Sequence, residues 1–407
     1  PMAVDLIHHG HINVINEARK LGRVTVGLLT DAAIARYKRV PLSTYEDRKK
    51  VIEHIVGVAA VVRQDTDDYV PILKKLKPDY FVHGDDWKTG VQAEKRQRVM
   101  AVMAAWGGKV FEPPYTKGIS STRLLETLAA QGTTPEKRAA RFQRVLGVKP
   151  FLRLIEAHNG LSGRIAEQAK VVTGEETREF DGLWVSAATD ALAKGKAAAA
   201  RLDLASLQGI IDQLSDVTTK PILVDIGAQA APDQAAAFAK TLERLGVSAL
   251  AFAEPDPSEG SEATPSKQTE RALCQGIAAV KAAQVTGRLL VFAGLRLSAG
   301  SAAAALARAK AFVAAGADGL LLQAGAADPK RFLAVCRACR ALKPRPLLAA
   351  VPGRQPLPEG ALRAAGVRFA VYPDALLQAV APAMKTAAEL LLSQGSGIPS
   401  EGRDPAV

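Results

Sequence analysis

Three histidines near the start of the chain could contact a phosphate. His8, His9 and His11 surround Gly10, directly after a short apolar run and at the start of a helical segment. Gly10 would let a ligand approach the backbone closely, and the free N–H groups at a helix start favour anionic oxygens. His8 and His11 could donate hydrogen bonds to phosphate oxygens and to a leaving pyrophosphate. A zinc site is the weaker interpretation, because no cysteine or obvious fourth ligand accompanies them. Exposed surface histidines are a third interpretation.

A second candidate phosphate-binding string occupies residues 115–124, Tyr-Thr-Lys-Gly-Ile-Ser-Ser-Thr-Arg-Leu. A glycine followed by hydroxyl residues before an apolar helix offers backbone amides and hydroxyls to phosphates. Alone, such a string is often only a helix N-cap. Together with the histidine motif it indicates a nucleotide site, whose expected binding residues here are Gly118, Ile119, Ser120, Ser121 and Thr122.

The cysteines suggest no further chemistry. Three cysteines in 407 residues cannot form a disulfide framework, so we expect a reducing cytoplasm. Cys336 and Cys339 form a C-x-x-C pair that invites a redox or zinc interpretation. Because they lie in a helical run without a second cysteine pair, we interpret them as two ordinary helix residues.

The composition bounds the function classes. The net charge is +12, and residues 1–140, with 22 Lys and Arg against 16 Asp and Glu, hold +6 of it. The charge is dispersed, without a basic tail, and aromatic residues are only 5%, so a nucleic-acid partner is not expected. Such a field suits small anions equally well, or is an ordinary basic surface. No apolar run reaches the length of a membrane span, and the first residues have neither a basic start nor an apolar h-region, so we expect neither a membrane partner nor a secretory signal.

The residues before 131 predict a doubly wound, Rossmann-like α/β domain that positions the histidines. Short, unalternating apolar runs are typical of parallel strands covered on both faces. The chain begins almost at the carboxyl end of the first expected strand, which is therefore short. The expected strands are 2–5, 24–29, 58–62, 80–83 and 109–112, and the expected helices are 12–21, 45–54, 70–76 and 95–106.

After a linker over 131–149 that leads into a helix, residues 150–393 predict a (β/α)₈ barrel. Eight strand candidates alternate with Ala-rich helices, although the first crossover, 158–181, is less clearly helical. The polar segment 255–268 is long for a βα loop and could be a lid. Residues 394–407 are expected to be a flexible tail. The expected strands are 152–157, 182–186, 222–225, 249–253, 289–293, 319–323, 347–351 and 368–372.

The front motifs resemble a known family. His8-x-Gly10-His11, with the string 118–122, resembles the cytidylyltransferase branch of the HxGH nucleotidyltransferases. The strings 84–88, Gly-Asp-Asp-Trp-Lys, and 45–48, Tyr-Glu-Asp-Arg, resemble the glycerol-3-phosphate and phosphocholine cytidylyltransferases. Lys38 stands where that family has its catalytic lysine. The resemblance covers about residues 1–130.

This resemblance implies in-line attack by a phosphate or phosphonate oxygen on the α-phosphorus of CTP, with release of pyrophosphate. It implies that Mg²⁺ bridges the phosphates with few protein ligands. Asp85, Asp86 and Trp87 would contact either the acceptor or the base, and packing is the alternative for Trp87. The residues expected to neutralise the triphosphate are His8, His11, Lys38 and Arg48, and those expected to cradle its β and γ phosphates are Ser120, Ser121 and Thr122.

The rear domain resembles the phosphoenolpyruvate mutase members of the isocitrate lyase superfamily over about residues 150–392. The resemblance rests on Glu156-Ala-His-Asn-Gly-Leu-Ser162, on residues 179–186 and on residues 217–222. Several phosphonate-pathway proteins have a similar arrangement, with a cytidylyltransferase domain in front of a mutase barrel. The retained site residues are Ser186, Asp190, Asp225 and Glu254.

The departures from that family indicate a vestigial barrel site. The metal-side string Asp-x-Asp is reduced to Asp225-Ile-Gly, and the gating loop becomes an unrelated Ser/Glu/Pro stretch after Glu254. An Arg-x-Glu is replaced by residues 293–295, and a histidine by Gln323. Losing several charge-stabilising contacts should abolish useful turnover, since one alone can cost about 10²–10³ in rate. We therefore expect a scaffold, with the chain forming a homo-oligomer through the barrel.

The leading hypothesis is a CTP-dependent cytidylyltransferase of phosphonate biosynthesis, acting on a 2-aminoethyl- or 2-hydroxyethylphosphonate type of acceptor. One alternative is a bifunctional enzyme that also interconverts phosphoenolpyruvate and phosphonopyruvate in the barrel. The other is a non-catalytic scaffold that only binds nucleotide.

Overall fold

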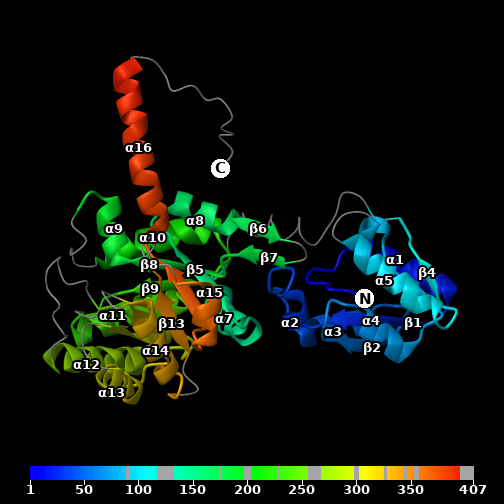
Figure 1. Cartoon of the computed structure of the whole chain (residues 1–407), viewed down its shortest axis with the longest axis horizontal. Coiled ribbons are helices and arrows are strands. Elements are labelled where there is room, and N and C mark those ends of the chain that lie inside the picture. The colour runs from blue at the N-terminus through cyan, green and yellow to red at the C-terminus, as the bar shows by residue number, and fades with distance from the viewer. Residues whose placement is uncertain are drawn as a thin grey trace. The chain divides into compact units, whose positions relative to one another are not determined.

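The computed structural model divides into two compact units, each described separately (Figure 1). The N-terminal unit comprises residues 1–128 and 170–179, and the barrel unit comprises residues 129–169 and 180–407. The described residues are 1–88, 92–114, 116, 133–173, 176–196, 203–227, 230–254, 267–297, 302–324, 328–342, 346–351 and 357–394.

The N-terminal unit is an α/β fold with parallel strand pairs, as predicted. β1 pairs with β2 and β3 pairs with β4, both in parallel. The expected first strand is reduced to one parallel bridge between Met2 and Leu28. The elements are α1 (His9–Leu21), β1 (Val24–Leu29), α2 (Asp31–Ile34), α3 (Tyr45–Glu53), β2 (Val58–Gln64), α4 (Val70–Leu76), β3 (Tyr80–Val82), η1 (Asp85–Trp87), α5 (Ala93–Ala104) and β4 (Lys109–Phe111).

Separate apolar clusters hold these elements together. One lies around β1 and α3, where Leu28 and Ile52 are fully buried. Another joins α4, β3, η1 and α5 through Phe81, Trp87 and Val99. Parallel strands covered by helices place the residues that follow them at one edge of a sheet, where ligands of α/β folds usually bind.

The barrel unit contains the eight predicted parallel strands, closed in the order β5, β8, β9, β10, β11, β12, β13, β14. Their side chains are almost entirely buried. The strands are β5 (Leu152–Glu156), β8 (Gly182–Ser186), β9 (Ile222–Asp225), β10 (Ala249–Phe252), β11 (Leu290–Arg296), β12 (Gly319–Gln323), β13 (Leu347–Ala350) and β14 (Phe369–Tyr372). The helices are α7 (Pro135–Val148), α8 (Gly160–Gln168), α9 (Ala187–Ala193), α10 (Leu204–Val217), α11 (Pro232–Arg244), α12 (Lys267–Ala283), α13 (Ala302–Ala314), α14 (Pro329–Cys339), α15 (Glu359–Ala364) and α16 (Ala375–Gln394).

Helix α7 belongs to the barrel, although the sequence predicts a linker over 131–149. Phe142 is fully buried, and its ring lies 5.4 Å from that of Phe369 and 6.5 Å from that of Phe292. Arg138 of α7 donates to the carbonyl of Leu245 over 2.9 Å. The helix therefore packs an apolar side chain against two barrel strands, β11 and β14, instead of merely connecting two domains.

The first crossover holds a helix and a hairpin. α8 is followed by β6 (Lys170–Thr173) and β7 (Glu176–Glu179), which pair in antiparallel. Val171 and Val172 of this hairpin are 62% exposed. The insertion explains why the segment 158–181 does not read as a simple helix.

Helix α16 projects from the barrel (Figure 1), and none of its side chains is buried. By length and composition alone it could span a membrane, unlike the sequence-based expectation that no apolar run is long enough. It contains Pro382 and an exposed ion pair between Lys385 and Glu389 at 3.8 Å. The expected lid, 255–268, lies outside the described residues except for 267 and 268, and so does the tail after 394.

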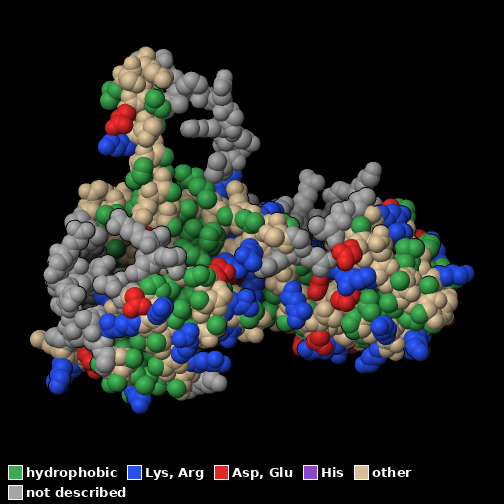
Figure 2. Space-filling view, viewed as in Figure 1, with side chains coloured by type: hydrophobic (Ala, Val, Ile, Leu, Met, Phe, Trp, Pro, Cys, Tyr) green, Lys and Arg blue, Asp and Glu red, His purple; other side chains and the backbone are tan. Residues whose placement is uncertain are grey.

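Basic side chains are spread over the visible face of both units and do not gather in one patch (Figure 2). This distribution agrees with the dispersed charge that the sequence indicates.

Candidate functional site

The side chains of His8 and His11 meet at the start of α1. His8 is the N-cap, and its Nδ1 accepts from the N–H of Gly10 over 3.2 Å. The Nδ1 of His11 accepts from the N–H of His8 over 3.3 Å, which completes a capping box. The ring centroids are 3.9 Å apart, whereas His9 is exposed. We call His8 and His11 the histidine pair.

The environment of the histidine pair disfavours protonation. Burial, followed by the charges of His8 and Lys38, lowers the pKa of His11 to about 4. Burial also lowers the pKa of His8, with His9 as the second cause. Both rings are therefore neutral at pH 7, and can act as hydrogen-bond donors that need no counter-ion.

Lys38 supplies the positive charge beside the pair, and it follows α2. Desolvation lowers the pKa of its ammonium although the residue as a whole is exposed, and the carboxylate of Asp86 partly offsets that effect. Asp86 also lies 3.8 Å from the Nδ1 of His83. The structure thus brings residues from α1, from the segment after α2 and from η1 into one electrostatic group.

Gly10 is tightly surrounded. A Cβ placed on Gly10 would lie 3.0 Å from Cε1 and Nδ1 of His8, and 3.5 Å from Cβ of Thr116. The hydroxyl of Thr116 accepts from the side-chain amide of Asn13 on α1 over 3.1 Å. Thr116 is the described residue of the string 115–124, so the start of that string lies at the first turns of α1. The expected binding residues Gly118, Ile119, Ser120, Ser121 and Thr122 lie outside the described residues.

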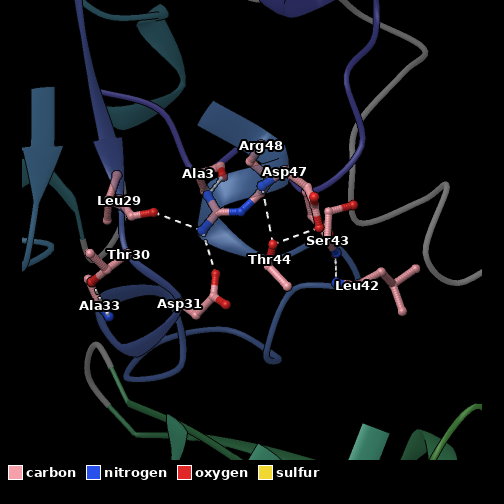
Figure 3. Close-up of polar contacts among 11 residues, drawn as sticks. Ala3, Leu29, Thr30, Asp31, Ala33, Leu42, Ser43, Thr44, Asp47 and Arg48 are labelled. Carbon is pink, nitrogen blue, oxygen red and sulfur yellow. Dashed lines mark hydrogen bonds and ion pairs between the residues drawn. The ribbon is translucent and has the colours of Figure 1, made fainter. Parts of the chain in front are cut away.

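Arg48 braces the unit from within (Figure 3). Its guanidinium donates to the carbonyls of Ala3 (2.5 Å) and Leu29 (2.9 Å) and to Oδ1 of Asp31 (2.6 Å). Its side chain is 1% exposed. This placement differs from the expected contact with a triphosphate. The guanidinium is buried, and three protein acceptors already bond to it.

Trp87 also lies in the interior. Its side chain is fully buried, stacks on His83 with 4.2 Å between ring centroids, and donates from Nε1 to Glu112 over 2.7 Å. This placement favours the packing alternative over a ligand contact. Asp85, by contrast, is more than one-third exposed and lies 3.9 Å from the ammonium of Lys88.

Two polar residues of this region escaped the sequence reasoning. Asp5 accepts from the N–H groups of Leu42 and Ser43 over 2.8 and 3.0 Å, and so fixes the loop before α3. His83 joins Asp86 to Trp87. The available signal was its position at the end of the predicted strand 80–83, since the carboxyl ends of parallel strands share one sheet edge.

Ser186, Asp225 and Glu254 lie at or just after the carboxyl ends of β8, β9 and β10, and Asp190 lies in the first turn of α9. We call this end of the barrel the barrel mouth. Ser186 donates to Glu156, and the N–H of Asp374 donates to the same carboxyl over 2.6 Å. Burial raises the pKa of Glu156 to about 7. Asp225 accepts from the N–H groups of Gly227 and Ala253, both over 2.9 Å, and burial raises its pKa to about 6.

The other two retained residues are paired with cations. Glu254, whose side chain is 3% exposed, forms an ion pair with Arg308. Asp190 accepts from Lys194 over 2.7 Å and from the hydroxyl of Ser206 over 2.7 Å. Within the part of the chain that the structure describes, no group of three or more His, Cys, Asp or Glu side chains is arranged to hold a metal ion. The described carboxylates of the barrel mouth instead bond to protein groups, and they do not form a ready Mg²⁺ site.

The C-x-x-C pair is structural. Cys336 and Cys339 are buried in the barrel core, and burial raises their thiol pKa values to about 12 and about 11. Thiolates are the reactive form, so these thiols are inert at neutral pH.

These features define a two-unit α/β protein, with a nucleotidyltransferase-like site at the first helix of one unit and a closed parallel barrel in the other. A family model described as phosphoenolpyruvate phosphomutase matches residues 142–392, and one described as cytidylyltransferase-like matches residues 4–127. The chain belongs to the phosphoenolpyruvate phosphomutase family and carries an N-terminal cytidylyltransferase-like domain.

Curated relatives match the N-terminal part. The bifunctional protein HldE of Magnetococcus marinus is 32% identical over 130 residues, which are 31% of this chain and 26% of that protein. The mouse ethanolamine-phosphate cytidylyltransferase is 35% identical over 125 residues, 30% of each chain. This chain thus matches only about a quarter to a third of the length of these relatives.

Solved structures match the barrel. The phosphoenolpyruvate phosphomutase from Streptomyces platensis subsp. rosaceus superposes with a TM-score of 0.56 and 24% identity, covering 66% of this chain and 92% of that one. A phosphonopyruvate hydrolase in complex with oxalate and Mg²⁺ gives 0.55 and 20%, covering 66% and 90%. At this identity the likeness shows the barrel fold alone.

Proposed function

We propose that the N-terminal unit transfers CMP from CTP to a phosphonate of the 2-aminoethyl or 2-hydroxyethyl type, releasing pyrophosphate, in cytoplasmic phosphonate biosynthesis. One observation carries the proposal: the histidine pair lies at the N-terminus of α1, with Lys38 close enough to lower the pKa of His11. Neutral donors, a helix dipole and one ammonium suit a triphosphate that loses its terminal pyrophosphate.

The proposed reaction needs little covalent work from the protein. An acceptor oxygen forms a bond to the α-phosphorus of CTP, and the bond from that phosphorus to the bridging oxygen of pyrophosphate breaks. His8, His11 and Lys38 hold and stabilise the charge that develops on the leaving group. Mg²⁺ enters as the complex with the triphosphate substrate. Asp85 and Asp86 lie on the neighbouring η1, where we place the acceptor.

Two comparisons support this choice of acceptor. The mouse relative is described as acting on ethanolamine phosphate, which differs from 2-aminoethylphosphonate by one bridging oxygen. The barrel belongs to a family named for phosphoenolpyruvate phosphomutase, whose chemistry makes a carbon–phosphorus bond. A chain that joins both domains fits a pathway that makes a phosphonate and then activates it.

The test is pyrophosphate release by the full chain with CTP and a panel of phosphonates and phosphate monoesters. We expect turnover with an aminoethyl- or hydroxyethylphosphonate, a loss of about 10²-fold or more in kcat for His11→Ala, and little change for His9→Ala, whose ring is exposed. Replacing CTP by ATP in the same assay tests whether the enzyme requires a cytosine nucleotide. Silence across the panel contradicts the proposal, and nucleotide binding without release favours a non-catalytic scaffold.

We propose that the barrel is a scaffold without mutase activity. Its four retained site residues are engaged with protein groups, and among the described residues they form no Mg²⁺ site. Interconversion of phosphoenolpyruvate and phosphonopyruvate by the full chain, abolished by Asp225→Asn, would support the bifunctional alternative.

The partner we propose for the scaffold is a second copy of this chain, bound through α16. Exposed apolar residues on this helix include Met384 (67%), Leu391 (45%) and Leu392 (86%). The ion pair of Lys385 and Glu389 argues against a membrane, because a span would bury both charges. Light scattering should show a dimer or larger that Met384→Asp with Leu391→Asp dissociates, while Lys385→Ala does not. A monomeric wild type, or one that sediments with vesicles, contradicts this assignment.

A further inference from the structure

One helix of the barrel unit places an arginine side chain against a carboxylate of the barrel mouth. Arg308 lies on α13, and its side chain is 12% exposed. The guanidinium donates to Oε1 of Glu254, at the end of β10. Its Nε also lies 3.8 Å from the carboxylate of Glu270 on α12. Arg308 thus connects two neighbouring helices to one strand end.

The second carboxylate oxygen of Glu254 is also used. Its Oε2 accepts from the N–H of Arg296 over 2.8 Å. The guanidinium of Arg296 donates to the carbonyl of Glu254 over 2.9 Å, and the side-chain amide of Gln323 bonds both the N–H (2.9 Å) and the carbonyl (3.1 Å) of Glu254. Hydrogen bonds therefore fix both the backbone and the carboxylate of Glu254.

A divalent cation needs several oxygen ligands that are free to coordinate. A buried carboxylate without a cation is costly, so the fold must supply a counter-charge from somewhere. The solved phosphonopyruvate hydrolase is described in complex with Mg²⁺. In this chain the positive charge next to Glu254 belongs to the protein itself.

We propose that Arg308 is the fixed counter-ion of Glu254, so that the barrel mouth is neutralised from within and takes no divalent cation. The assignment concerns the barrel alone and does not depend on the proposed transferase activity. It explains how an acidic barrel mouth keeps its carboxylate when the surrounding residues no longer form a metal site.

The first test counts Mn²⁺ bound by the full chain without nucleotide, using the electron paramagnetic resonance signal of the free ion. Wild type and Glu254→Gln should bind the same amount, because Glu254 is not a ligand. Mn²⁺ that wild type binds and Glu254→Gln loses would overturn the proposal. The comparison excludes ions bound elsewhere, since both proteins keep the same N-terminal unit.

The second test is a double-mutant cycle on barrel unfolding, measured by calorimetry. The barrel transition is the one that Phe142→Ala shifts. Arg308→Met should lower this transition by several degrees, because it removes the ion-pair partner of Glu254 and leaves Arg296 as the remaining described cation beside it. Adding Glu254→Gln should restore most of the loss, since an amide needs no counter-ion. The matched control is Lys310→Met, an exposed lysine on the same helix. An unchanged transition in Arg308→Met, or no restoration in the double variant, refutes the counter-ion.

Discussion

The guanidinium of Arg48 donates to the carboxylate of Asp31 over 2.6 Å, with side chains 1% and 15% exposed. The same guanidinium also donates to Ala3 and Leu29, so one residue of α3 ties down the first residues of the chain, the end of β1 and the start of α2. Because the histidine pair follows Ala3 and Lys38 follows α2, this brace sets the position of both candidate phosphate contacts.

Arg48→Met should therefore act first on stability. Removing one partner of a buried ion pair typically costs about 3–5 kcal/mol, so we expect a clear loss in urea unfolding of the N-terminal unit. Lys50→Met, an exposed change on the same helix, is the control and should cost little. If the variant kept normal stability but had a raised KM for CTP, Arg48 would instead contact the triphosphate, as the resemblance implies.

Gly10→Ala should impair the candidate site more than the fold. The added Cβ would lie 3.0 Å from the ring of His8, which must then shift by a few tenths of an ångström from its place at the N-terminus of α1. We expect a fall of about tenfold or more in kcat/KM for pyrophosphate release, with a small change in unfolding temperature. His9→Ala is the control one residue away. Equal activity of both variants would argue that the His8 ring is not held for function.

The stability of the N-terminal unit should depend on pH through His11. Burial lowers its pKa from 6.5 to about 4 in the folded protein. Between those values only the unfolded chain binds this proton, so the free energy of unfolding should fall as the pH drops from about 6.5 towards 4. We expect about 2 kcal/mol from this group, allowing for solvent screening. His11→Asn should flatten the profile in urea titrations at several pH values; an unaltered slope would contradict this.

Phe142→Ala should destabilise the barrel. The side chain is fully buried between the rings of Phe292 and Phe369, and such a truncation typically costs about 3–5 kcal/mol. Calorimetry of the full chain should show one transition shifted by this variant. Leu146, which lies on the same helix and is only partly buried, offers Leu146→Ala as a milder control. If Phe142→Ala shifted nothing, α7 would be a linker after all.

The strands were the most predictable part of the fold. β1, β8, β9 and β12 lie where the apolar runs place them, because short buried parallel strands carry a continuous apolar signal. β11 runs on to Arg296, beyond the predicted end at residue 293, since its last residues bond to β12 in register. The hairpin of β6 and β7 carries mixed exposed residues and gives no such signal.

The candidate site was predictable only in its local part. The start of α1 at the histidines follows from residues that are neighbours in sequence. The partners of Arg48 and Arg308 lie on other elements, and nothing within their own segments indicates which charge will meet them. Burial of Trp87 likewise depends on packing between α4, β3 and α5, so sequence reasoning left its role open between packing and binding.

The capping box at His8 and His11 also decides which ring nitrogen carries the proton. Both Nδ1 atoms accept from backbone N–H groups, so in each neutral imidazole the hydrogen must sit on Nε2. The helix start thereby locks the tautomer of both rings before any ligand arrives. Each ring then has its single N–H on the atom farthest from the backbone, and the reorganisation needed to donate to an incoming anion is already complete in the folded chain.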